Sequence, residues 1–402
     1  MLVVESLLLA LTMILSLVSR HLLNTFPARS THRQRVYLGQ EMNEGEGWEN
    51  YTHNYGPEKS APYLIHQTVK SFESPLPAKL PIVNGPDAPG VRKLGESCSE
   101  IERAEIRSFA VMFKHIVDHI PVLSATKHKG EMGRLAVVGG SKEYTGAPYF
   151  SGISALHCGA DLVHIICADA AAPVIKSYSP DLIVHPDLDN NLPEAQKWID
   201  KTGAVVFGPG LGLSGNLENT KKLISHCRTS NKPIVIDADG LSIVTHEPEI
   251  VKGYKNVILT PNVVEFSRLY TALLGHNPSE SDNATELLAK TLDGVTIVRK
   301  GPKDLISNGE TTIFCGEEGS PRRCGGQGDL LSGTMVTFFH WFNQALIVNG
   351  NLPFPPTIGA ALAACALTRR CSKLAFAKYG RSMVTVNMIP EIQFAFQQLF
   401  KK

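Results

Sequence analysis

Short apolar runs alternate with longer segments of mixed polarity over most of this chain. Six of these runs are rich in valine and isoleucine and have the length of buried strands: residues 134–138, 161–167, 204–207, 233–236, 257–259 and 295–298. Most are separated by segments long enough for a helix. Because strands that are apolar on both faces must be covered on both, the pattern predicts an α/β fold with a mainly parallel sheet between helices. Ligand loops in such sheets follow the carboxyl ends of the strands.

Apolar positions outside these runs recur at helical spacing. An amphipathic helix before Pro121 is indicated by Ile106, Phe109, Phe113, Ile116 and Ile120. We expect folded structure to begin with this helix, from about residue 101. Further helices are predicted at 357–376 and 387–400. Segments 304–308 and 311–315 are expected to form a hairpin. Residues 101–402 are therefore predicted to form one domain.

The first hundred residues differ in character. In the segment 1–23, the apolar run from Leu7 to Val18 is short for a membrane span, carries Glu5 before it, and is followed by arginines. A targeting signal, an anchor or a plain tail are all compatible with it, so the compartment, cytoplasmic or mitochondrial, stays open. Residues 24–100 are polar and proline-rich, and we expect a disordered linker.

Composition narrows the function classes. The chain has 402 residues, 43% of them hydrophobic, and a formal net charge of +1. This supplies a large core but lacks the basic excess that nucleic-acid binding requires, so no nucleic-acid partner is expected. The eight cysteines contain no CxxC pair, which disfavours a zinc site or a disulfide framework.

The segment from Cys324 to Gly333 combines flexible backbone, one carboxylate and a helix start. Glycines at 325, 326 and 328 allow neighbouring N–H groups to turn toward one point, and helically spaced apolar residues follow. Such a helix N-terminus favours negative charge and could hold a phosphate beside Asp329 as general base. The ordinary alternative is that Asp329 merely belongs to the first turn of a helix. We favour catalysis because other motifs accompany this one.

Several predicted strands run into loops suited to ligands. Residues 134–138 lead to Gly139-Gly140-Ser141, and 204–207 lead to the glycine-rich loop 208–212. The latter lacks the dinucleotide fingerprint GxGxxG because position 213 is leucine. Asp237 and Asp239 follow another strand, where an Asx turn is favoured over an indirect magnesium site.

Two further loops carry polar or charged groups. Asn262 and Glu265 are three residues apart at a helix start, so they could hold a hydrated Mg²⁺ or form a capping box, with about equal weight. Lys300 follows the last predicted strand and could neutralise phosphate charge during transfer, although a solvated surface lysine is the ordinary alternative.

Seven short motifs occur in one order along the predicted domain: residues 127–130, 138–140, 144–149, 208–212, 237–241, 262–268 and 322–329. In this order they resemble the ATP-dependent NAD(P)H-hydrate dehydratases of the ribokinase-like superfamily. The resemblance covers roughly residues 120–401, and the residues before about 97 lie outside it. It implies a ribokinase-like three-layer sandwich for the catalytic domain 101–402.

The resemblance also implies site residues. The residues that it implies for binding the hydrated dinucleotide are Gly210, Asn262, Val263, Val264, Glu265, Phe266, Ser267, Arg268 and Asp329. The residues that it implies for binding ATP are Lys300, Gly301, Pro302, Lys303, Asp304, Gly319, Ser320, Pro321, Arg322, Arg323, Cys324, Gly325, Gly326, Gln327 and Gly328. Magnesium would accompany ATP, with Asn262 and Glu265 as indirect ligands.

The implied activity is a hydro-lyase reaction in metabolite repair. It would dehydrate S-NADHX and S-NADPHX to NADH and NADPH at the expense of ATP, with ADP and phosphate released. An NAD(P)H-hydrate epimerase would be a functional partner, and a homo-oligomer is compatible with the resemblance. The runner-up is a small-molecule kinase of the same superfamily, which would keep its phosphorylated product. Gln327 in the loop GGQGD favours the dehydratase, because the kinases more often show a GAGD-type loop.

Overall fold

The computed structural model describes residues 100–212, 215–278 and 283–401. The predicted apolar segment 1–23 lies outside the described residues, as does the predicted linker 24–100 apart from Glu100. Among the described residues, no helix has both the length and the apolar character needed to cross a membrane.

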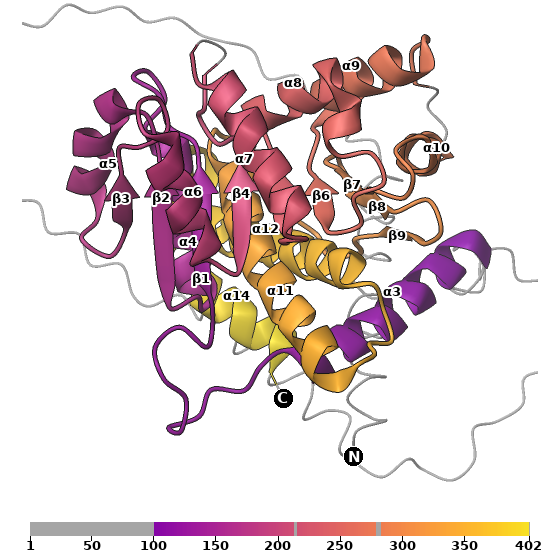
Figure 1. Ribbon diagram of the computed structural model, residues 1–402. Helices are drawn as coiled ribbons and strands as arrows, with labels where there is room; N and C mark the ends of the chain where they lie inside the picture. Colours follow the sequence, from indigo (N-terminus) through magenta and orange to yellow (C-terminus); the bar gives the residue numbers. More distant parts are fainter. Residues whose placement is uncertain (1–99, 213–214, 279–282, 402) are drawn as a thin grey trace, which may run out of the picture. The chain divides into compact units, whose positions relative to one another are not determined.

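Nine strands form one sheet in the order β3-β2-β1-β4-β5-β6-β7-β8-β9, which Figure 1 shows running from β3 at the left to β9 at the right. The strands are β1 Arg134–Val138, β2 Leu162–Ile166, β3 Ile183–His185, β4 Ala204–Phe207, β5 Ile234–Ile236, β6 Val257–Leu259, β7 Thr296–Arg299, β8 Leu305–Ser307 and β9 Thr312–Phe314. Strands β1 to β7 are parallel, and β8 and β9 continue the sheet as an antiparallel hairpin. All six predicted strands and the hairpin are confirmed. The short edge strand β3 was not predicted.

Twelve α-helices are described. They are α3 Glu100–His119, α4 Gly146–Cys158, α5 Ala172–Tyr178, α6 Leu192–Asp200, α7 Leu217–Thr229, α8 Asp239–His246, α9 Val263–Leu274, α10 Asn283–Thr291, α11 Gln327–Asn349, α12 Pro356–Tyr379, α13 Thr385–Met388 and α14 Glu391–Phe400. The single helix predicted at 387–400 is wrong in its first part. There Pro390 separates α13 from α14, because proline lacks the N–H that a continuous helix needs.

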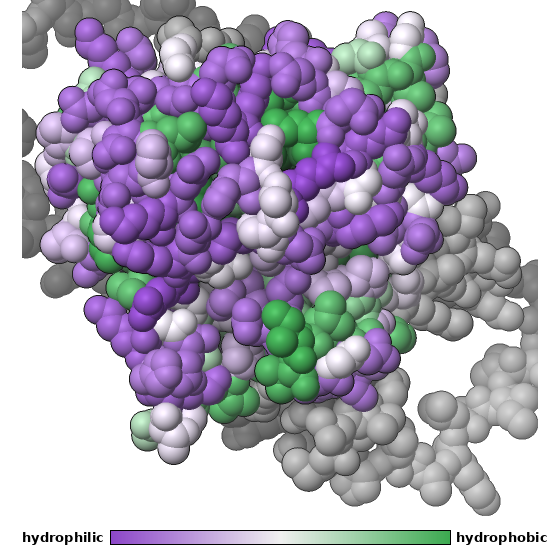
Figure 2. All heavy atoms as spheres, in the orientation of Figure 1, coloured by the Kyte–Doolittle hydropathy of each residue, from purple (hydrophilic) through white to green (hydrophobic). Residues whose placement is uncertain are grey.

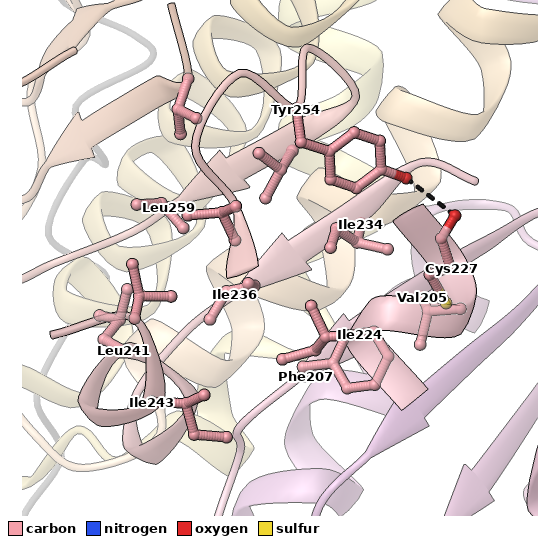
Figure 3. Packing of buried hydrophobic residues seen from close by; sticks show 14 of the residues in the cluster. Val205, Phe207, Ile224, Cys227, Ile234, Ile236, Leu241, Ile243, Tyr254 and Leu259 are labelled. Atoms are coloured by element: carbon pink, nitrogen blue, oxygen red, sulfur yellow. Dashed lines mark hydrogen bonds between the residues drawn. The ribbon is translucent and has the colours of Figure 1, made fainter. Parts of the chain in front are cut away.

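Helices cover both faces of the sheet, as the near-continuous apolar strands predicted. On one face α4 contacts β1 and β2, α11 contacts β4 and β5, and α12 contacts β6 to β8. On the other face, alternate strand residues such as Val205 and Phe207 join apolar residues of α6 to α10 in one buried cluster. Part of this cluster appears in Figure 3, where the Tyr254 hydroxyl donates a hydrogen bond to the Cys227 carbonyl at 3.2 Å. The three-layer α/β fold is confirmed.

The surface in Figure 2 is mainly hydrophilic, and apolar residues show in separate areas of that face. The long apolar helix α11 is instead buried along most of its length, from Leu330 to Asn343. It can occupy this position because glycine and small residues let neighbouring helices approach closely. At Gly333 a Cβ atom would lie 1.9 Å from the Ser151 carbonyl oxygen of α4.

The close contact between Gly333 and Ser151 leads to a prediction about the stability of the protein. The substitution Gly333→Ala should lower the free energy of unfolding by at least about 2 kcal/mol, because the methyl group can fit only if α4 and α11 separate. Chemical denaturation followed by circular dichroism measures the change. The control is Gly146→Ala in the first turn of α4, where the nearest atom to an added Cβ is 3.9 Å away. Equal stabilities of the two variants would contradict this account of the helix packing.

Candidate active site

The loops with candidate chemistry meet at the carboxyl edge of the sheet. Strand β1 pairs with β2 on one side and with β4 on the other. The chain therefore adds β2 and β3 on one side of β1 and then adds β4 and the later strands on its other side, so the strand order reverses between β1 and β4. Open parallel sheets bind ligands beside such a reversal, outside the carboxyl ends of the strands. The loops after β1, β4, β5, β6 and β7 all leave from this edge.

The two glycine-rich loops after β1 and β4 contact each other directly. The Gly140 N–H lies 3.0 Å from the Pro209 carbonyl, and a Cβ at Gly139 would come within 2.2 Å of that same oxygen. Gly210 has a φ of +61°, and a Cβ there would lie 2.6 Å from the Tyr144 carbonyl. The predicted dinucleotide residue Gly210 is therefore packed against the segment 144–147 by a contact that only glycine allows.

The glycine loop before α11 has the predicted form. Gly326 adopts a φ of +92° and precedes α11, which places Asp329 in the first turn of the helix. The Thr385 hydroxyl holds the loop by donating to the Gly325 carbonyl at 2.7 Å. The Gln327 side-chain amide donates to the Arg322 carbonyl at 3.2 Å. These two hydrogen bonds hold the loop against the residues around it.

Lys300 connects this helix start to the loops after β5 and β6. Its Nζ atom donates to Asp237 Oδ1 at 2.8 Å and lies 4.0 Å from Glu265 Oε2. A Cβ at Gly328 would lie 3.4 Å from the same Nζ and 3.8 Å from Asp237 Oδ2, so the first turn of α11 faces this ion pair. The alternative of a solvated surface lysine is wrong for Lys300, whose side chain is only 20% exposed.

Burial and nearby charges shift the pKa values of Asp329, Glu265 and Lys300. Burial, together with the negative charge of Asp237, raises the pKa of Asp329 to about 7, although Lys300 opposes this shift. Burial also raises the pKa of Glu265, and Lys300 again acts in the opposite direction. For Lys300 itself, burial alone would lower the pKa, but Asp237 and Glu265 outweigh burial and raise it. Lys300 is therefore a cation among carboxylates, and Asp329 is suited to exchange a proton near neutral pH.

Asn262 and Glu265 form the capping box that was one of their two predicted roles. Asn262 Oδ1 accepts hydrogen bonds from the N–H groups of Val264 and Glu265, and Glu265 Oε2 accepts one from the Asn262 N–H at 2.7 Å. These contacts occupy the Asn262 oxygen, so a hydrated Mg²⁺ fits better beside Glu265 than beside Asn262. No group of three or more His, Cys, Asp or Glu side chains within the described part of the chain is arranged to hold a metal ion.

The predicted dinucleotide segment 262–268 divides into exposed and buried parts. Val263 and Val264 are each 57% exposed at the start of α9, and Arg268 is exposed one turn later. Phe266 is buried, with the Arg299 guanidinium 4.9 Å from its ring centroid, so it packs against the core of the domain. Ser267 is partly buried.

The two predicted ATP segments also divide by exposure. Pro302 and Lys303 are exposed, whereas the Asp304 carboxylate is buried and accepts bonds from the Gly301 N–H and from Arg369. In the second segment, Ser320 is buried, Arg322 donates to the Met383 carbonyl, and Arg323 donates to the Ser320 carbonyl. Pro321 and Gly325 are exposed, and Gly319, Cys324 and Gly328 are partly buried.

Asp237 is the site residue whose importance the sequence analysis underestimated. Its main-chain oxygen accepts from the Gly240 N–H, as a turn requires, but its buried side chain also accepts from Thr260 at 2.7 Å and from Lys300. Ala238 beside it has a φ of +48°, an uncommon backbone conformation for alanine and one that clusters at functional sites. The spacing of two carboxylates after a strand signalled the position, but not its partner 63 residues away.

The sheet has a ribokinase-like fold, and the loops at its carboxyl edge surround a lysine, several carboxylates and a glycine-rich helix start, which are groups suited to binding phosphate and its counter-ions. A ribokinase-like superfamily protein of Enterococcus faecalis shares the fold, with a TM-score of 0.60 at 19% identity over 72% of this chain and 95% of that one. An ADP/ATP-dependent NAD(P)H-hydrate dehydratase from Bacillus subtilis, co-crystallised with ATP and Mg²⁺, has a TM-score of 0.55 at 20% identity, covering 71% and 97%.

Closer sequence relatives narrow the class to a family. Residues 135–393 match the family described as NAD(P)H-hydrate dehydratase. The rat ATP-dependent (S)-NAD(P)H-hydrate dehydratase is 49% identical over 72% of this chain and 85% of its own length, and the human protein is 50% identical over 70% and 82%. The chain belongs to the NAD(P)H-hydrate dehydratase family.

The raised pKa of Asp329 predicts a pH-dependent stability. Between the ordinary carboxyl pKa and about 7, the folded protein binds a proton that the unfolded chain has lost, so the wild type loses stability as the pH rises through this window. Asp329→Asn removes this loss. We expect the variant to be more stable than the wild type at about pH 8 by on the order of 1 kcal/mol, with little difference near about pH 4.

Urea denaturation of both proteins across this pH range, without ligands, tests the expectation. Glu310→Gln serves as the control, because Glu310 is an exposed side chain in the turn between β8 and β9. A stability difference for Asp329→Asn that stays constant with pH would show that Asp329 titrates as an ordinary surface carboxyl.

Proposed function

We propose that this protein catalyses the ATP-dependent dehydration of S-NADHX and S-NADPHX to NADH and NADPH, with release of ADP and phosphate. Family membership supports the reaction, since relatives about 50% identical over most of their length carry this name. The observation in the structure that supports it best is the position of Asp329 in the first turn of α11, with its pKa near 7 and Lys300 close by.

Asp329 is the proposed general base. The hydroxyl on the hydrated nicotinamide ring is a poor leaving group, so it must first be converted into a phosphate ester. Asp329 takes the hydroxyl proton while the oxygen attacks the γ-phosphorus of ATP, and the bond to the departing ADP breaks. A carboxylate with a pKa near the working pH is a more effective base than one with an ordinary pKa.

The second half of the reaction needs less from the protein. The lone pair on the ring nitrogen expels the phosphate, and loss of a proton from the neighbouring carbon restores the ring double bond. Catalysis is therefore mainly positioning and charge stabilisation. The N–H groups at the start of α11 and the ammonium of Lys300 are the groups that stabilise charge on the transferred phosphate.

The substrates are assigned to different parts of the edge. We place the hydrated dinucleotide against Gly210 and the exposed residues at the start of α9, and ATP against Lys300 to Asp304 and the loop 319–328. Mg²⁺ usually keeps several waters and binds nucleotide phosphates through one or two carboxylates, so Glu265 would hold it through water. The ion would neutralise phosphate charge during transfer.

Two associations with other protein chains are also proposed. Because the enzyme acts on the S epimers, an NAD(P)H-hydrate epimerase is the proposed functional partner that supplies them from the R epimers. Assembly into a homo-oligomer is also a proposal, testable by light scattering. For the compartment, cytoplasmic or mitochondrial, localisation of the full-length chain is the direct measurement.

The activity test uses purified protein, ATP, Mg²⁺ and hydrated NADH. We expect the dihydronicotinamide absorbance to return in step with phosphate release. Asp329→Asn should lower kcat by ~10²- to 10⁴-fold, because the ring hydroxyl loses its proton acceptor. Glu310→Gln should turn over like the wild type.

The same assay separates the dehydratase from the kinase. A phosphorylated product that accumulates without NADH would establish the kinase. Near-normal turnover by Asp329→Asn would remove this residue from the mechanism while leaving the overall reaction intact.

The pH dependence of kcat/KM tests the link between Asp237 and Asp329. Activity should fall on the acid side of about pH 7, because protonated Asp329 cannot act as a base. Asp237→Asn removes a negative charge that raises the pKa of Asp329, so the acid limb should move to lower pH even if the maximum rate falls. An acid limb that stays in place would show that Asp237 does not set the protonation of the base.

A further inference from the structure

Both segments assigned to ATP are attached to the same turn of α12. Arg369 and Ser372 are three residues apart on this helix, so their side chains share one face. Arg369 reaches the loop 301–304, and Ser372 reaches Ser320 in the second segment. The hairpin of β8 and β9 joins these two segments and pairs Cys315 with Asp304, so the position of the second segment beyond Cys315 depends on contacts outside the hairpin.

The guanidinium of Arg369 binds the first loop at three points. Its Nε donates to Asp304 Oδ2 at 2.6 Å, Nη1 donates to the Pro302 carbonyl at 2.9 Å, and Nη2 donates to the Gly301 carbonyl at 2.8 Å. Asp304 Oδ1 accepts from the Gly301 N–H at 3.0 Å, which closes the loop on itself. The planar fork of arginine can satisfy these acceptors together, whereas a lysine ammonium would reach them from one point.

Ser372 binds the second segment at its first buried residue. Its hydroxyl accepts from the Ser320 N–H at 2.9 Å and lies 2.8 Å from the Ser320 hydroxyl. Gly319 lies against both helix residues, since a Cβ there would be 3.6 Å from Arg369 Cγ and from Ser372 Oγ. Arg370 adds a nearby attachment by binding both carboxylate oxygens of Glu317.

The spacing of these loops matters for the chemistry. Lys300 directly precedes the loop held by Arg369, and its Nζ must stay beside Asp237 and the start of α11. The second segment continues into the glycine loop that carries Asp329. In a reaction that depends on positioning, a displacement of about 1 Å can cost about 10²-fold in rate. A rigid connection between the two loops would therefore act on the reaction without touching either substrate.

We propose that Arg369 and Ser372 are positioning residues for phosphoryl transfer, fixing the loop 300–304 and the loop 319–328 at the spacing that ATP requires. The inference rests on the proposed function, because it takes both loops to be the nucleotide site. It goes beyond that function in assigning a role to two α12 residues that are themselves outside the predicted site.

Kinetic constants distinguish positioning from a purely structural role. Arg369→Lys keeps the charge but loses the fork, and Ser372→Ala loses the attachment to Ser320. For each variant, KM for ATP should rise at least about 10-fold and kcat should fall by about as much, while KM for hydrated NADH stays within about twofold. The assay is run at saturating Mg²⁺ and well below the unfolding temperature, which circular dichroism measures for each protein.

The matched control is Arg228→Lys. Arg228 on α7 also donates to two loop carbonyls, those of Glu249 and Lys252, but this loop precedes β6 at the opposite end of the sheet. The Arg228→Lys substitution should lower the stability of the protein and leave the KM values for ATP and for hydrated NADH unchanged. The double variant Arg369→Lys, Ser372→Ala tests whether the two act together, in which case its effect on KM for ATP should differ from the product of the single effects.

The outcomes separate this inference from the proposed function. If the wild type regenerates NADH and both single variants keep the wild-type KM for ATP, the positioning role is wrong. If Arg369→Lys does not fold, the KM for ATP, the kcat and the KM for hydrated NADH of Ser372→Ala decide whether the positioning role holds. If the wild type does not turn over hydrated NADH at all, the proposed function fails, and ATP affinity measured by calorimetry on the same variants decides the positioning role.

Discussion

The ammonium group of Lys300 is the interaction on which the candidate site depends. It forms the buried ion pair with Asp237 and lies near Glu265, while Asp329 faces it from the start of α11. Carboxylates at this density would repel one another and take up protons without a cation among them. Lys300 thus allows loops from three strands and one helix to converge at a single point.

The balance of charge at this point favours chemistry over stability. Full neutralisation would give Asp329 an ordinary pKa and make it a weaker base, whereas stronger burial without Lys300 would keep it protonated. The site lies between these limits, with a pKa for Asp329 of about 7. Strain at Ala238 and the close contacts of Gly139 and Gly210 belong to the same edge. The compensating stability comes from the core on both faces of the sheet, where α11 is buried from Leu330 to Asn343 and the cluster around Phe207 is buried.

The residue pattern within a short segment was sufficient to predict the elements that this pattern itself defines. The valine and isoleucine runs gave all six predicted strands, and the glycine loop before Asp329 gave the start of α11. The short strand β3 escaped prediction because three residues at a sheet edge carry little periodic signal, and its stability comes from pairing with β2. The capping box at Asn262 could be named from residue types alone, but choosing between a cap and a metal ligand required the position of the side-chain oxygens.

The sequence by itself determined the fold class, the order of the motifs and the identity of the proposed base, because each depends on residue types within a few positions of one another. Only the tertiary structure showed that Asp237 pairs with Lys300, that the Asp304 carboxylate is used inside its own loop, and that α12 holds both loops through Arg369 and Ser372. Apart from the contact within the Asp304 loop, these contacts join residues separated by 52 to 65 positions. They follow from how helices and strands pack, which no local pattern encodes.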